Sequence, residues 1–151
     1  MKIGVVNVNH ILETSQRGRS LLQKLSELNA KYESEGTAMA NKIQELQERL
    51  QQISASPTQQ ANLAKLQRDV QMTELSLRQL QERAQSDMTM TSERYRQRVF
   101  SEIATVVEAY AKQNSIDLVL YTPNPQIAFA SSAATLTNAI LERYDLTFGG
   151  R

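Results

Sequence analysis

The strongest constraint on the fold is a repeat of apolar residues at alternating three- and four-residue steps between residues 19 and 114. Before Pro57 the repeat contains Leu21, Leu25, Leu28, Tyr32, Met39, Ile43, Leu46, Leu50 and Ile53, and after it Leu63, Leu66, Val70, Leu77, Leu80 and Ala84. This spacing places a narrow apolar seam on one helix face, as in coiled coils. Pro57 cannot donate a helical hydrogen bond and disfavours helix at the preceding residue. We therefore expect two antiparallel helices, residues 19–53 and 58–114, joined by a tip near 54–57.

The seam shifts its register at two places, which makes Gly36 and Met88 candidate hinges of the hairpin. Gly36 stands where the repeat slips by one residue, and glycine costs roughly 1 kcal/mol of helix propensity relative to alanine. A glycine that simply lets the two helices approach closely is an equal alternative. From Val99 onward the apolar stripe widens, which indicates that this end of the second helix packs into a body.

Three short apolar segments outside the repeat are predicted to be strands: residues 2–8, 116–121 and 127–130. Apolar side chains on both faces are typical of strands that are buried on both sides. A turn at residues 122–125 separates the last two segments, so they are expected to form a hairpin.

Short helices are expected near both ends of the chain. Asn9 suits the N-cap of a brief helical turn, and Gly18 is expected to loosen the chain before the first long helix. Ser131 or Ser132 can cap a final helix, after which residues 148–151 are expected to be mobile. The apolar stripe of this last helix is Leu136, Ile140 and Tyr144.

Together these elements predict a mostly helical α+β protein. A small β-barrel-forming body, residues 1–18 and 99–151, would carry a long antiparallel coiled-coil hairpin arm, residues 19–98. Three short strands leave edges that one chain cannot cover, so we expect a closed homo-oligomer, although this reasoning does not give the subunit number. The residues expected at the oligomer interface are Ile3, Val5, Val6, Val8, Ile116, Leu118, Val119, Leu120, Ile127 and Phe129.

Composition limits the class of protein. Among 151 residues, aromatic side chains make up only 5% and Trp is absent, which fits a solvated rod better than a large core. The formal net charge of +1 gives no general preference for nucleic acid, and no apolar run reaches the ~20 residues that span a bilayer. Cysteine is absent, so disulfides and thiolate metal sites are excluded. No signal peptide precedes the first predicted strand, so the chain is either cytosolic or has lost its targeting segment.

Chemical motifs are scarce. His10 is the only histidine, and neither a glycine-rich phosphate loop nor a nucleophile elbow is present, so we expect no enzyme, no metal and no cofactor. Arg94, Arg96 and Arg98 surround Tyr95. They could contact anionic lipid headgroups or acidic protein weakly, or simply form the polar face of a helix.

Four segments in this order around a Gln-rich hairpin resemble the Skp (OmpH-like) family of periplasmic chaperones. They are KIGVVN at residues 2–7, IDLV at 116–119, IAFASS at 127–132 and TLT at 135–137. The resemblance implies a homotrimer with a central β-barrel and three helical arms around a cavity. It also implies a periplasmic location, with the signal peptide removed, and unfolded outer-membrane proteins as clients, held without nucleotide. Two features depart from the family: this chain is nearly neutral, and Met90 and Thr91 stand where some relatives carry basic residues for lipopolysaccharide.

The functional hypothesis is an ATP-independent holdase that encloses its clients. The alternative is a structural coiled-coil adaptor that docks fixed protein partners. A prefoldin-like arrangement is disfavoured, because here the strands flank the two helices instead of lying between them.

Overall fold

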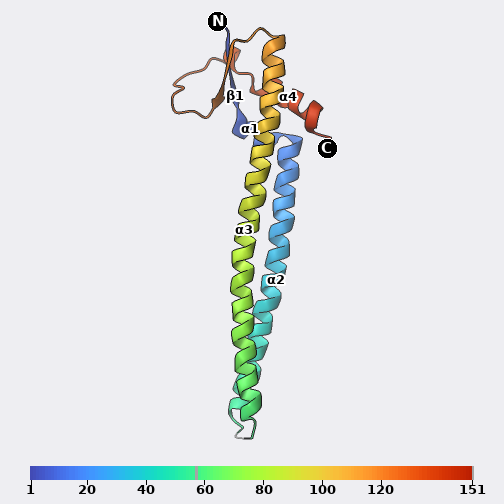
Figure 1. Cartoon of the computed structure of the whole chain (residues 1–151), viewed down its shortest axis with the longest axis vertical. Helices are drawn as coiled ribbons and strands as arrows, with labels where there is room; N and C mark the ends of the chain where they lie inside the picture. Colours follow the sequence, from blue (N-terminus) through green and yellow to red (C-terminus); the bar gives the residue numbers. More distant parts are fainter. Residues whose placement is uncertain (57, 151) are drawn as a thin grey trace. The chain divides into compact units, whose positions relative to one another are not determined.

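The structure is a computed structural model and describes residues 1–56 and 58–150 of the chain. Its elements, labelled in Figure 1 where there is room, follow in the order β1 (Ile3–Asn7), α1 (Val8–Thr14), α2 (Gln16–Ser54), α3 (Gln60–Gln113), β2 (Leu118–Thr122), the 3₁₀ turn η1 (Ser132–Ala134) and α4 (Thr137–Phe148). The chain divides into two compact units. The terminal unit comprises Met1–Lys24 and Thr91–Arg151, and the hairpin unit comprises Leu25–Met90.

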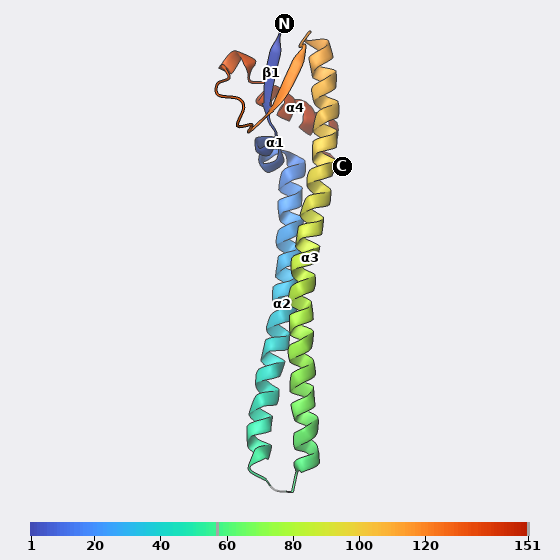
Figure 2. The same ribbon diagram turned by 60° about the vertical axis from the view of Figure 1, so that its left-hand side comes forward.

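The two long helices confirm the mostly helical architecture that the apolar repeat predicts. Within the hairpin unit, α2 and α3 run antiparallel and side by side, as both ribbon views show (Figures 1 and 2). The predicted tip includes Pro57, which lies outside the described residues. The terminal unit extends along α2 to Lys24 and resumes in α3 at Thr91, whereas the sequence interpretation placed these boundaries at residues 18 and 99.

The first long helix begins earlier than expected, and Gly18 lies inside it. The prediction that Gly18 loosens the chain is wrong. Gly18 is buried, its backbone N–H donates to Ser15 Oγ at 3.0 Å, and a Cβ at this position would lie 1.7 Å from the carbonyl oxygen of Leu12. Glycine is therefore needed here because the backbone of α1 passes too close for any side chain.

The first strand is shorter than predicted, because Asn7 ends it and starts α1. The Asn7 side chain accepts a hydrogen bond from the backbone N–H of His10 at 3.0 Å, which makes Asn7 the N-cap. The prediction that Asn9 caps this helix is therefore wrong, and Val8 belongs to the helix instead of the strand.

β1 and β2 form a parallel two-stranded sheet. Their register runs from Ile3 opposite Leu118 to Asn7 opposite Thr122. The other edge of β1 is partly covered, because Val5 bridges Thr135 and accepts a hydrogen bond from the Leu136 N–H at 2.8 Å. Within the described residues, the outer edge of β2 has no partner strand.

The predicted third strand is absent from the described residues. Residues 127–130 form no strand, and the Ile127 N–H donates only to Asn124 within the preceding turn. The predicted hairpin with the second strand is therefore wrong: the segment does not pair with the outer edge of β2, which stays open among the described residues, and both edges of β1 are taken by β2 and by Thr135. Ser131 caps η1, and α4 begins later, at Thr137, so the cap predicted for the last helix is also wrong.

One hydrophobic core lies in the terminal unit, between α1, α3, α4 and β1. Its buried members are Val6, Val8, Ile11, Val99, Ile103, Val106, Val107, Ile140 and Tyr144. The widened stripe on α3 and the predicted stripe on α4 both pack here. Phe148, which was expected in a mobile tail, is the last residue of α4 and packs against this core.

Candidate functional site

A polar network in the terminal unit joins the start of α2 to α3 and α4. Arg17 Nη2 lies 3.0 Å from Glu102 Oε1, and both side chains are almost fully buried. Arg98 Nε also donates to Glu102 Oε1, at 3.1 Å, and the Tyr144 hydroxyl donates to Oε2 at 2.8 Å. The Tyr95 hydroxyl donates to the backbone carbonyl of Arg17. Burial, and then the hydrogen bond to Glu102, raise the pKa of Tyr144.

The sequence carried little sign of this network. Arg17 precedes the predicted helix and looks like one of many surface cations, yet its guanidinium also lies 5.8 Å from the ring centroid of Phe148. Burial of Arg17 follows from tertiary packing that no local pattern reports.

The predicted oligomer interface divides into core and surface residues. Val6 and Val8 are 0% and 2% exposed in the core of their own chain, so the prediction is wrong for these two residues. Val5 is also buried, and Ile116, Val119, Leu120 and Ile127 are half-buried. Ile3, Leu118 and Phe129 are exposed, with Phe129 at 84%. For residues that keep accessible surface, a role in self-association stays a prediction.

The two candidate hinges, Gly36 and Met88, both lie inside unbroken helices. Their hinge role stays a prediction. A Cβ added to Gly36 would meet nothing closer than Leu77 Cδ1 at 3.9 Å, which is ordinary contact. An alanine would therefore fit at this position, and the alternative that Gly36 simply lets the two helices approach closely also stays a prediction.

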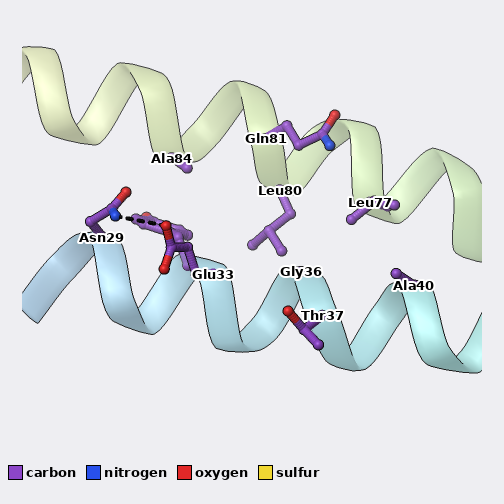
Figure 3. A pocket seen from close by; sticks show the side chains of 10 residues that line it. Asn29, Glu33, Gly36, Thr37, Ala40, Leu77, Leu80, Gln81 and Ala84 are labelled. Atoms are coloured by element: carbon purple, nitrogen blue, oxygen red, sulfur yellow. Dashed lines mark hydrogen bonds between the residues drawn. The ribbon is translucent and has the colours of Figure 1, made fainter.

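A groove lies between α2 and α3 within the hairpin unit, beside Gly36. We call it the Gly36 groove, and its volume is about 560 Å³. It is lined by Asn29, Tyr32, Glu33, Gly36, Thr37 and Ala40 of α2 and by Leu77, Leu80, Gln81 and Ala84 of α3. Figure 3 shows Leu80 pointing from α3 into the space beside Gly36, with Ala40 and Ala84 contributing little bulk. Sequence reasoning missed this groove, although Gly36, Ala40 and Ala84 are small residues near or at seam positions.

A hydrogen bond between the two helices fixes one wall of this groove. The Tyr32 hydroxyl of α2 donates to the Asp87 carboxylate of α3. That hydrogen bond is the main cause of a raised pKa of Tyr32, because ionising the phenol would place two negative charges together.

Large apolar side chains also stand in solvent on α3 of the hairpin unit. Met72, Leu75 and Met90 are 58%, 46% and 48% exposed. Methionine is flexible and polarisable, so such residues suit contacts with varied partners.

Conventional catalytic features are not evident in the described residues. No group of three or more His, Cys, Asp or Glu side chains within 1–56 and 58–150 is arranged to hold a metal ion. Among these residues, no helix has the length and apolar character needed to cross a bilayer.

Comparison with known proteins agrees with this architecture. The family model of the outer membrane protein (OmpH-like) family matches residues 2–144. A crystal structure of an OmpH-like protein from Caulobacter crescentus CB15, assigned as an outer membrane chaperone, superposes with a TM-score of 0.87 at 14% identity, covering 97% of this chain and 85% of that one. Among curated proteins, no sequence matches the chain. With the family match spanning nearly its whole length, the chain belongs to the OmpH-like family.

Proposed function

We propose that the chain is a chaperone of the holdase type, which binds unfolded outer-membrane proteins in the periplasm without ATP. The observation that carries this proposal is the apolar surface of the hairpin unit, where Met72, Leu75 and Met90 stand about half exposed. Membership of the OmpH-like family and the chaperone assignment of the Caulobacter protein support it.

The proposed mechanism is many weak contacts acting together. Burial of apolar surface contributes roughly 25 cal/mol per Å², so a partly exposed methionine supplies only a modest gain by itself. Several hairpins around one client would raise the effective concentration of every contact. The total affinity for the client would therefore be high although each single contact is weak. Because single contacts break easily, the client can dissociate without a hydrolysis step.

The proposed active form is a homotrimer. The outer edge of β2 lacks a partner among the described residues. Leu118 on β2 and Ile3, which lies opposite it on β1, are exposed, and so is Phe129, which follows β2 in the sequence. Pairing of this edge with another subunit would satisfy its backbone groups and cover these side chains. In such a trimer residues 19–98 would serve as arms, and the register shifts at Gly36 and Met88 would let the arms bend around clients of different size.

A weak contact with anionic lipid is a further part of this proposal. Arg94 and Arg96 are exposed on α3, whereas Arg98 is engaged with Glu102. Two such cations would attract an anionic surface only weakly, and salt would screen the attraction.

The decisive experiment dilutes a urea-unfolded β-barrel membrane protein into buffer and follows turbidity. Stoichiometric trimer should suppress aggregation with or without ATP. If aggregation proceeds unchanged, the holdase proposal fails. Crosslinking in a lysate tests the adaptor alternative, because an adaptor would capture one or two dominant proteins and a holdase many.

A further inference from the structure

We propose that the Gly36 groove is a client subsite that takes one aromatic side chain from an extended segment with Lys or Arg beside that side chain. This inference rests on the proposed holdase function and adds a binding preference to it. The groove lies entirely within the hairpin unit, between two helices of the same chain.

The space suits a large apolar side chain. A volume of about 560 Å³ falls within the roughly 300–1,000 Å³ that is usual for ligand pockets. Gly36 has no side chain, Ala40 and Ala84 are small, and Leu77 and Leu80 supply apolar walls (Figure 3). An aromatic ring is the side chain that gains most from such a place, because it buries ~150–250 Å² at little cost in rotamer freedom.

Polar groups on the rim suit an extended backbone. Asn29, Thr37 and Gln81 line the groove beside its apolar walls. An unfolded segment carries unpaired N–H and C=O groups, and amide and hydroxyl side chains can both donate to them and accept from them. These contacts do not depend on the client's sequence, which is what a chaperone with varied clients needs.

Charge complementarity identifies the neighbours of the aromatic residue. Among the described residues that line the groove, Glu33 is the charged one, and its carboxylate accepts a hydrogen bond from Asn29 Nδ2 at 3.0 Å. Around Tyr32, the carboxylates of Asp87 and Glu35 outnumber the cation of Arg83. The hairpin unit as a whole has seven Lys and Arg against nine Asp and Glu, a net charge of −2.

A cation next to the docked ring would therefore be attracted to the rim of the groove. A client carboxylate would be repelled there, and its desolvation beside Glu33 would weaken binding further. The groove thus distinguishes between unfolded segments by the charge that flanks an aromatic residue.

The test uses the full chain and three labelled peptides that differ only in a central triplet: Lys-Phe-Lys, Glu-Phe-Glu and Lys-Ser-Lys. Fluorescence anisotropy should show saturable binding of the Lys-Phe-Lys peptide and binding weaker by about tenfold or more for Glu-Phe-Glu. The Lys-Ser-Lys peptide, which has charge without a ring, should not saturate.

Two matched variants locate the binding. Ala40→Phe fills the groove and should weaken Lys-Phe-Lys binding by about tenfold or more. Ala38→Phe adds the same ring at an exposed position of α2 outside the groove lining and should leave binding unchanged. Circular dichroism establishes that both variants keep their helix content. In addition, a photoreactive phenylalanine analogue in the peptide should crosslink to residues 29–40 and 77–84 of the unsubstituted chain. This measurement uses no variant, so its result does not depend on how the variants fold.

The outcomes separate this inference from the proposed function. If the chain suppresses client aggregation but Ala40→Phe and Ala38→Phe bind the peptide equally, the groove is not the subsite and the holdase proposal stands. Equal binding of the Lys-Phe-Lys and Glu-Phe-Glu peptides, or crosslinks elsewhere on the chain, would also overturn the inference. If aggregation is not suppressed at all, the proposed function fails regardless of peptide binding.

Discussion

The guanidinium of Arg17 lies 3.0 Å from the carboxylate of Glu102, and the two side chains are only 8% and 12% exposed. The same carboxylate accepts a hydrogen bond from Tyr144. Glu102 therefore connects the start of α2 with α4 from its own position on α3. Arg17 Nε is buried without a hydrogen-bond partner among the described residues, so this guanidinium depends heavily on Glu102.

Replacing Glu102 by Gln should destabilise the terminal unit strongly. The amide keeps the shape and can still accept from Tyr144, but it leaves the buried guanidinium without a counter-charge. Removing one partner of a buried ion pair costs about 3–5 kcal/mol. Urea denaturation followed by circular dichroism measures the loss. Glu108→Gln is the control: Glu108 pairs with Lys112 on the surface, where both side chains are mostly exposed, so loss of this ion pair should hardly change the midpoint. Equal midpoints for the two variants would contradict the interpretation.

Two glycines in α2 should respond to alanine in opposite directions. Gly18→Ala places a Cβ 1.7 Å from a backbone oxygen of α1, so the backbone must shift. Such overpacking should cost about 1–3 kcal/mol or more. Gly36→Ala has room, since its nearest neighbour would be 3.9 Å away, and should stabilise the helix by roughly 0.5–1 kcal/mol. Thermal unfolding of both variants against the unsubstituted chain checks the two signs, and a destabilised Gly36→Ala would contradict the open groove.

Alkaline pH should weaken the terminal unit through Tyr144. Its pKa in the folded chain is raised by burial and by the hydrogen bond to Glu102, whereas an unfolded tyrosine titrates near ~10. The stabilising contribution is complete below pH ~10 and is lost as the pH rises above that value, because only the unfolded chain releases the proton. The free energy of unfolding should therefore start to fall at about pH 10 and continue to fall as the pH rises further. The fall should be smaller in Tyr144→Phe, and an equal fall in both chains would exclude Tyr144 as a cause.

Leu118→Lys should reduce the subunit number without unfolding the chain. Leu118 is exposed on β2, whose outer edge lacks a partner among the described residues, so a charge there should oppose the proposed association. Light scattering should report a lower mass and circular dichroism an unchanged spectrum. Val6→Lys is the contrasting variant: Val6 is fully buried, so a charge there should unfold the terminal unit. An unchanged mass for Leu118→Lys would argue against this interface.

Removing the exposed apolar side chains of α3 should weaken client holding. In Met72→Gln/Leu75→Gln both substitutions lie on solvent-exposed positions, so the midpoint of unfolding should hardly change. Suppression of client aggregation should then require more protein. The control Gln71→Ala/Gln79→Ala alters exposed positions of the same helix without removing apolar surface. Equal suppression by both variants would show that these side chains do not contact the client.

The long helices could be predicted because the signal is repeated over many turns. Steps of three and four residues recur from Leu21 to Ala84, and one proline marks the break. The apolar stripe of the last helix could be predicted in the same way, and its residues Ile140 and Tyr144 are fully buried. In each case a local period reports directly which face packs.

The features that escaped prediction depend on contacts between distant segments. Residues 127–130 have a strand-like composition, yet within 1–56 and 58–150 no strand pairs with them, even though the outer edge of β2 is open, so composition alone misled. Burial of Arg17 and the need for Gly18 both arise from the passage of α1 and α4 close to α2. The Gly36 groove reflects which small residues of two helices face each other, and this requires the register of the hairpin.

The pairing of Ile3 with Leu118 has a consequence for the order of folding. During synthesis, β1 leaves the ribosome long before β2. Until β2 is made, the backbone amide groups of β1 are hydrogen-bonded to water. Pairing β1 with β2 closes a loop that contains both long helices, and this closure costs conformational entropy. Each helical turn of α2 that packs against α3 shortens the flexible part of that loop and so lowers the cost. We therefore expect the helices to dock before the sheet forms, so that a nascent chain ending before Leu118 would hold an unpaired apolar strand open to misassembly.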